Sequence, residues 1–217
     1  MAIPRAAQTQ RRTRIQEEKE ELILEAALEV FSQRGFHGST IDQIADVAGM
    51  SKPNLLYYFR TKEAMHRALI DRVLENWLEP LQAFDAEGDP EEEIRSYIRR
   101  KLEMAREFPR ESRLFANEVL QGAPHIMAVL EGPLKELVDE KAEVIRVWIA
   151  SGKVRDCDPH HLIFSIWSTT QHYADFDVQV KAVLGAGRDG VERFEEAASF
   201  LEGLFVSGLI LKPPVSP

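Results

Sequence analysis

The sequence predicts an all-α protein of about nine helices, with a small helix-turn-helix head followed by a larger helical body. Three observations support this prediction. Apolar residues recur every three or four positions in most segments, as they do on the buried face of a helix. No alternating apolar and polar run of any length indicates a strand. Glycines and prolines separate the periodic segments at Glu87–Pro90, Pro109, Gly122–Pro124, Gly152 and Gly185–Gly187.

The head begins with a helix over about 15–34, which Gly35 can end as a residue of positive φ. Ser39 and Thr40 supply capping chemistry for a short second helix that reaches Ala48. Further along, Ser51 caps a third helix that runs to about Tyr58 and tolerates Pro53 in its first turn, and Thr61 caps a fourth that continues through Leu81. In the body we expect helices over 91–107, 110–121, 124–151, 158–182 and 190–211, with a kink or split at Gly132–Pro133.

Composition excludes several classes of protein. No window approaches 18 consecutive apolar residues, so we expect no membrane span. The first 14 residues are polar and basic without an apolar core, unlike a secretory signal, and we read 1–14 as a flexible arm. The single Cys157 cannot form an intramolecular disulfide and suits a reducing compartment. These features predict a cytoplasmic protein.

The net charge of −9 is unusual for a nucleic-acid binder, but the charge is unevenly distributed. Residues 1–62 hold nine Lys and Arg against eight Asp and Glu, or +1, which leaves 18 against 28, or −10, for the remainder. The first 14 residues contain four Arg and no acid. Because the local asymmetry decides whether a polyanion binds, the head can meet DNA while the acidic body is kept away from it.

The stretch from Ser39 to Phe59 predicts a helix-turn-helix. Two small residues, Ala45 and Ala48, allow the helix axes to cross closely, and Gly49 can adopt the positive φ of the turn. Lys52, Asn54 and Tyr57 then point outward from the second helix of the pair, where they suit the major groove. The alternative is an ordinary helical hairpin with a glycine turn.

Several residues of this stretch fall in register with one family: Phe36, Thr40, Ile44–Ala45, Ala48–Gly49, Ser51, Phe59 and Lys62–Glu63. On these positions 15–62 resembles the DNA-binding domain of the TetR family of regulators, which would make 63–217 a ligand-binding and dimerisation domain. One departure is Leu56, where the family usually has a tyrosine. The resemblance implies base contacts by Lys52, Pro53, Asn54 and Tyr57, and phosphate contacts by Thr40, Tyr58 and Lys62. Thr40 and Lys62 would lie at helix N-termini, which favour anions.

The basic arm has two possible roles: Arg11, Arg12 and Arg14 either reach into the adjacent minor groove or belong to a solubilising tail.

A head of this size makes few base contacts, and dimers overcome this by reading two half-sites roughly 34 Å apart. The resemblance assigns the dimer contact to the segments 158–182 and 190–211. The second carries an apolar stripe that is either interface or plain core: Phe194, Ala197, Ala198, Leu201, Leu204, Phe205 and Leu209.

The whole chain resembles the branch of this family that regulates pyrimidine utilisation. The resemblance rests on 54–59 in the head and on 76–81, 112–115, 161–164, Trp167 and 170–176 in the body. It implies a repressor that an effector of the size of uracil or thymine releases from DNA. We predict that ligand between the fourth and eighth helices moves the fourth. An operator and a homodimer are the other implied partners, and no cofactor is expected.

A pyrimidine offers an imide edge and two flat faces. Gln171 presents both an amide donor and an acceptor to such an edge, and Trp77 and Trp167 could sandwich the ring. Further candidate ligand-binding residues are Tyr97, Lys101, Asn117 and Thr170. Asn117 stands where the resemblance predicts an apolar residue, so a regulator of another pathway with a different ligand is one alternative. The tryptophans could also be plain core and Gln171 a satisfied buried amide.

Other classes of function have weaker support. His172 and Asp175 could share a metal, but no third ligand or HExxH pattern accompanies them, and His160 and His161 cannot share one helix face. Cys157 lies beside acids, which is unfavourable for an activated thiolate. We therefore expect neither an enzyme nor a metal site. A DNA-bound scaffold with a protein partner and no ligand stays open as an alternative.

Overall fold

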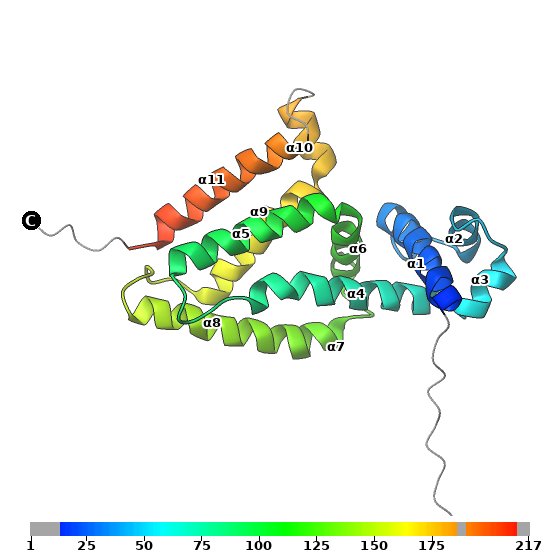
Figure 1. Cartoon of the computed structure of the whole chain (residues 1–217), viewed down its shortest axis with the longest axis horizontal. Coiled ribbons are helices and arrows are strands. Elements are labelled where there is room, and N and C mark those ends of the chain that lie inside the picture. The colour runs from blue at the N-terminus through cyan, green and yellow to red at the C-terminus, as the bar shows by residue number, and fades with distance from the viewer. Residues whose placement is uncertain (1–13, 186–189, 212–217) are drawn as a thin grey trace, which may run out of the picture. The chain divides into compact units, whose positions relative to one another are not determined.

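The computed structural model describes residues 14–185 and 190–211, and these divide into two compact units, one ending at Leu69 and the other beginning at Ile70. Both are helical (Figure 1). Strand-like pairing among the described residues is limited to a single antiparallel bridge between Val154 and Ile210. No described helix is long and apolar enough to cross a membrane.

The first unit contains α1 (Arg14–Arg34), α2 (Ile41–Val47), α3 (Lys52–Tyr58) and the start of α4 (Lys62–Gln82). Buried apolar residues of α1, among them Ile23, Ala27 and Phe31, meet Ile44 of α2 and Leu55 of α3 in one small core. Burial of these side chains stabilises α2 and α3, because helices of seven residues are too short to be stable alone in water.

Local chemistry fixes the ends of α2. The Thr40 hydroxyl accepts a hydrogen bond from the Gln43 backbone N–H (3.3 Å), and the Gln43 side chain accepts one from the Thr40 backbone N–H (3.0 Å). This capping box satisfies two donors that the start of a helix would leave unpaired. At the other end Gly49 adopts φ +63°, the left-handed conformation that favours glycine, and the chain turns into α3. The predicted capping by Thr40 and turn at Gly49 are confirmed.

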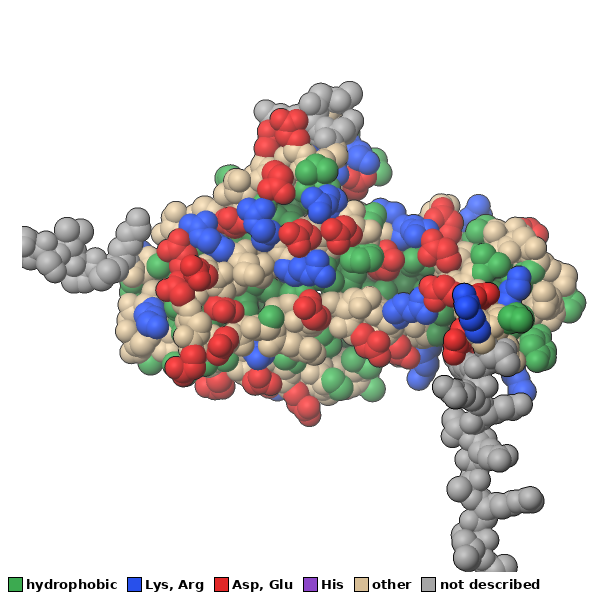
Figure 2. Space-filling model, in the orientation of Figure 1, with side chains coloured by type: hydrophobic (Ala, Val, Ile, Leu, Met, Phe, Trp, Pro, Cys, Tyr) green, Lys and Arg blue, Asp and Glu red, His purple; other side chains and the backbone are tan. Residues whose placement is uncertain are grey.

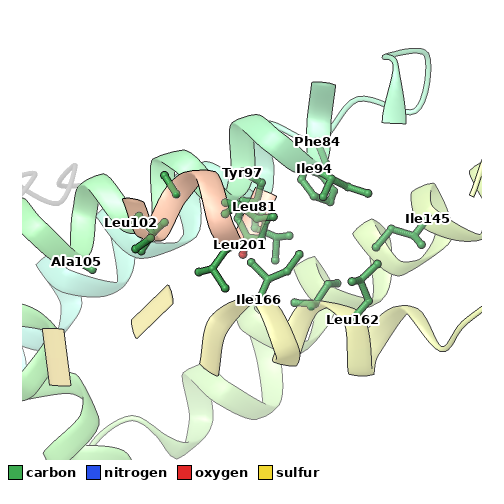
Figure 3. Close-up of a cluster of buried hydrophobic side chains, with 14 of the residues drawn as sticks. Leu81, Phe84, Ile94, Tyr97, Leu102, Ala105, Ile145, Leu162, Ile166 and Leu201 are labelled. Carbon is green, nitrogen blue, oxygen red and sulfur yellow. The ribbon is translucent and has the colours of Figure 1, made fainter. Parts of the chain in front are cut away.

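The second unit contains the rest of α4 together with α5 (Pro90–Glu107), α6 (Pro109–Leu120), α7 (Met127–Val129), η1 (Leu130–Leu134), α8 (Lys135–Ala150), α9 (Pro159–Asp175), α10 (Asp177–Leu184) and α11 (Val191–Leu209). α5 packs against both α9 and α11. Its apolar side chains, including Tyr97 and Leu102, lie in one cluster with Ile166 of α9 and Leu201 of α11 (Figure 3).

Two predicted helices of the body differ from the structure. The expected helix over 158–182 is two helices, because Phe176 leaves the helical conformation (φ −111°, ψ 28°) between α9 and α10. The expected helix over 124–151 begins as one turn of α7 and passes through the π-helical η1, which contains Gly132 and Pro133, before α8. A proline lacks the N–H that continues α-helical bonding, and the α-helical hydrogen bonding is interrupted at the site of the predicted kink or split.

Candidate functional site

The exposed face of α3 carries the four residues predicted to contact bases. Lys52, Pro53, Asn54 and Tyr57 are all exposed, and Tyr57 keeps 72% of its surface in solvent. Leu55 is fully buried and anchors the helix from its opposite face. A cationic donor, an amide and a flat phenol therefore project together from one short helix. This set can donate to guanine, pair with adenine and contact a thymine methyl group.

Lys52 forms an exposed ion pair that it can exchange for another partner. Its ammonium lies 2.9 Å from a carboxylate oxygen of Asp42, and both side chains are about half exposed or more. Ion pairs of this kind contribute little net stability, typically less than about 1 kcal/mol. Lys52 can therefore leave Asp42 for a base edge at small energetic cost.

Thr40 and Tyr58 are placed where a phosphate could reach them. Thr40 is exposed, and because its hydroxyl oxygen accepts the capping bond, its own hydroxyl proton is still available as a donor. Tyr58 is half-buried, and its ring meets that of Tyr57 edge-on at 5.2 Å. The phosphate assignments of these two residues remain predictions.

Lys62 is engaged inside the head. Its ammonium donates to the backbone carbonyls of Phe36 (2.7 Å) and Ser39 (2.8 Å), and it lies 4.2 Å from the centre of the Phe36 ring. Two of its three protons are thereby used. In the structure Lys62 holds the segment that leads into the Thr40 cap, and its phosphate contact remains a prediction.

The predicted arm falls mostly outside the described residues, and Arg11 and Arg12 lie there. Arg14 differs from the prediction, because it is the first residue of α1 and its guanidinium pairs with Glu18 at 2.9 Å. It therefore belongs to the helix.

A small cavity in the body brings four of the predicted ligand-binding residues together. Trp77, Lys101, Trp167 and Gln171 line a space of about 40 Å³, from α4, α5 and α9. The remaining lining residues, which sequence reasoning did not assign to the site, are Leu74, Leu78, Leu81, Phe115 and Leu134. Since benzene occupies an engineered cavity of roughly 150 Å³, this space has to expand before it can hold a six-membered ring.

Tyr97 and Thr170 do not line this cavity. The Tyr97 hydroxyl accepts a 2.5 Å hydrogen bond from the Trp167 indole N–H. Tyr97 therefore orients Trp167 without itself lining the cavity. Thr170 is fully buried, and its hydroxyl donates to the Ile166 and Trp167 carbonyls within its own helix. The prediction that Thr170 binds ligand is therefore not supported: its hydroxyl is directed at the backbone.

Asn117 lies in an adjacent groove between α6 and α9. This groove measures about 410 Å³, and its polar lining includes Arg113, Asn117 and Asp175. Phe115 and Gln171 line both the groove and the inner cavity, so these two side chains lie between them. No periodicity in the sequence distinguished Phe115 from an ordinary core residue.

Lys101 and Asp175 give the interior unusual electrostatics. Lys101 is only 3% exposed, and burial lowers its pKa to about 7, although the Asp175 carboxylate opposes the shift. Burial likewise raises the pKa of Asp175, against a 2.5 Å hydrogen bond from the Ser112 hydroxyl and the positive charges of Arg113 and Lys101. Lys101 thus lines the cavity with an amine whose pKa lies near neutral pH.

The histidines and the cysteine discussed as catalytic candidates have other contacts. His172 stacks on Phe176 at 5.0 Å while Asp175 accepts from Ser112, so these two side chains are directed to different partners. His160 hydrogen bonds to Asp139 at 2.9 Å. Burial and the charges of Asp156 and Asp158 raise the pKa of the Cys157 thiol, which disfavours a reactive thiolate.

The apolar stripe predicted on the last helix is mostly core. Phe194, Ala197, Ala198 and Leu201 are buried, Phe205 and Leu209 pack against the same cluster, and Leu204 is exposed. Exposed apolar side chains outside this stripe include Phe164 of α9 and Phe200 of α11. Acidic and basic side chains are intermixed on the face of the body that Figure 2 shows. Arg99 forms ion pairs with Glu195 and Glu202 of α11.

We predict that Lys62→Met destabilises the head by about 1–3 kcal/mol, because it removes two charge-assisted hydrogen bonds and a cation–π contact. Urea unfolding measures the loss. Lys52→Met is the matched control, since its exposed ion pair should contribute less than about 1 kcal/mol. Equal stability of the two variants would show that Lys62 does not hold the head together.

We also predict that stability depends on pH through Lys101. Its folded-state pKa of about 7 lies below the unfolded value of 10.5, so the unfolded chain binds more protons between these limits and stability rises with pH there. The contribution is at most about 1.4 kcal/mol per pH unit. Urea unfolding from pH 7 to 9 should show a shallower rise for Lys101→Met than for wild type and Lys153→Met. Identical slopes would contradict the assignment.

Both parts of the chain match known family models. Residues 23–69 match bacterial regulatory proteins of the tetR family, and residues 70–212 match the C-terminal region of YcdC-like proteins. The chain is 48% identical over 201 residues to the HTH-type transcriptional regulator RutR of Escherichia coli strain K12, which covers 93% of this chain and 95% of that protein.

Solved structures agree on the fold. The ketosteroid transcriptional regulator KstR2 of Mycobacterium tuberculosis superposes with a TM-score of 0.67 at 19% identity, covering 90% of this chain and 96% of that one. AibR in complex with isovaleryl coenzyme A and operator DNA gives 0.66 at 20% identity, with 86% and 97% covered. The chain belongs to the TetR family, whose members bind operator DNA, dimerise and bind small-molecule effectors, and it is a DNA-binding transcriptional regulator, not an enzyme.

Proposed function

We propose that this regulator is a repressor that a pyrimidine base, uracil or thymine, releases from its operator. The observation that carries the proposal is the inner cavity, where Trp77, Trp167, Lys101 and Gln171 come together from three helices. The resemblance of the body to regulators of pyrimidine utilisation adds support. The 48% identity to RutR extends over nearly the whole chain.

The chemistry of the cavity suits a small imide ring. Gln171 is half-buried and offers a donor and an acceptor, which match the N–H and a carbonyl of an imide edge. Trp167 is fixed by Tyr97 and offers an aromatic wall. Apolar side chains such as Leu78 and Leu134 complete the lining and exclude larger polar ligands.

The small volume of the cavity supplies a mechanism for release. A ring must push the lining apart, and Leu74, Trp77, Leu78 and Leu81 of the lining all belong to α4. The same helix begins at Lys62, which holds the Phe36 and Ser39 carbonyls of the head. We infer that filling the cavity displaces α4 and changes the spacing of the two recognition helices in the dimer. Coupling of this kind is typically about 1–3 kcal/mol.

A regulator that responds to a different small molecule is the second candidate. The outer groove favours it, because Arg113 and Asn117 would recognise an acidic or amide-bearing group beyond the ring. A scaffold without ligand is the third possibility, and a thermal shift with uracil or thymine separates it from the first. Saturation at 100-fold the Kd should stabilise the protein by about 2.7 kcal/mol.

The DNA-binding role of α3 is tested by Lys52→Ala. After selection of an operator from random duplexes, the variant should select a different base at the position that Lys52 reads, with discrimination reduced by about 1–3 kcal/mol. Lys153→Ala, an exposed lysine of the body, is the control. An unchanged selected sequence for both variants would remove Lys52 from the base contacts.

The effector role is tested by Gln171→Ala. The variant should bind the operator with wild-type affinity in a gel-shift titration but should no longer be released by uracil or thymine, because the imide edge loses its partner. Cytosine and adenine are included as ligand controls. Release of the variant at the wild-type uracil concentration would exclude Gln171 from the site.

A further inference from the structure

The three tryptophans of the chain differ in how their indole N–H groups are satisfied. Trp148 donates to the Ala86 carbonyl at 3.2 Å, and Trp167 donates to the Tyr97 hydroxyl at 2.5 Å. The indole nitrogen of Trp77 is buried and has no hydrogen-bond partner among the described residues, although Trp77 is only 7% exposed. Buried donors are nearly always paired in folded proteins, so this exception requires an explanation.

Trp77 lies at the cavity, and its neighbour there is a second buried donor. The Lys101 ammonium is 5.4 Å from the centre of the Trp77 ring, and both side chains line the same 40 Å³ space. Lys101 is 3% exposed and has Asp175 as its opposing charge. Two side chains that carry donors, Trp77 of α4 and Lys101 of α5, therefore line the cavity, whereas Gln171 of α9 contributes an amide that can donate and accept.

We propose that Trp77 recognises the effector through its indole N–H, which together with Lys101 binds a carbonyl oxygen of the ligand. This inference rests on the proposed pyrimidine effector and deepens it. It changes the role of Trp77 from the aromatic face expected from the sequence to a directional donor. The ligand class is a flat neutral ring with a carbonyl at the end that meets α4 and α5 and an imide N–H within reach of Gln171.

The physical reason is that an unpaired buried donor destabilises the ligand-free protein, and a ligand oxygen removes that penalty on binding. The present cavity has room for about one water molecule, whose position a carbonyl oxygen would take. Recognition by an otherwise unpaired polar group is also selective, since a ring without an acceptor at that position leaves the donor unsatisfied. Uracil and thymine carry carbonyls on both sides of the imide N–H.

Trp77→Phe tests the inference, because phenylalanine keeps an aromatic ring and removes the N–H. Uracil binding is measured by calorimetry on the full chain, together with the melting temperature of the ligand-free protein. We expect the uracil Kd to rise roughly three- to tenfold, the usual effect of one lost hydrogen bond. The melting temperature should fall less than it does when a paired indole N–H is removed in the same way, because Trp77→Phe no longer buries an unpaired donor.

Trp148→Phe is the matched control, with the same chemical change at a residue outside the cavity lining. It should lower the melting temperature, because the Ala86 carbonyl loses its donor, and leave the uracil Kd unchanged. An unchanged Kd for Trp77→Phe, with uracil bound normally by wild type, would overturn the role of the N–H alone. Absence of uracil and thymine binding to wild type would instead overturn the proposed effector and this inference with it.

A second measurement, on the wild-type protein, tests the inference even if the Trp77→Phe variant does not fold. In the 15N-labelled wild-type protein, three indole N–H resonances report the three tryptophans. Uracil should move the Trp77 resonance downfield and leave that of Trp148 in place. A Trp77 resonance that does not move when uracil saturates the protein would contradict the proposed hydrogen bond.

Discussion

Polar groups that folding removes from water must find partners, and this constraint organises both functional regions of the chain. In the head, the Lys62 ammonium satisfies two backbone carbonyls beside the Thr40 cap and so holds the approach to α2. In the body, Lys101 is buried with the partly buried Asp175 as an opposing charge, and the Trp77 N–H has no partner among the described residues. Completed pairs hold the segment before α2 in the head, and we propose that the unpaired Trp77 N–H marks the ligand site of the body.

The same distinction separates the two lysines of the DNA-binding head. Lys62 is bound at short distances to backbone atoms, which cannot move away without disrupting the segment before α2. Lys52 is bound to a single exposed carboxylate on Asp42, which it can leave. Sequence-specific recognition requires a contact residue such as Lys52 that can change partners. It also requires a rigid helix to carry that residue, because a loosely held segment loses more entropy when it binds.

The head could be predicted from sequence in detail because its signals are local. The capping pattern at Thr40, the positive φ of Gly49 and the early Pro53 each act within a few residues. The break at Phe176 was missed because neither glycine nor proline marks it. Phe194 and Leu201 were assigned to a possible interface because their neighbours on α5 are distant in sequence. The contacts of Lys62 could not be predicted for a related reason: the Phe36 and Ser39 carbonyls are distant in sequence, and residue type does not reveal such tertiary partners.

A crystal structure of the dimer on a selected operator duplex would test the roles of both lysines. We predict that Lys52 has left Asp42 and donates to a base edge in the major groove beside Asn54 and Tyr57. We also predict that Lys62 still donates to the Phe36 and Ser39 carbonyls. A structure in which Lys62 has moved to a phosphate while Lys52 remains on Asp42 would contradict the roles assigned to both residues.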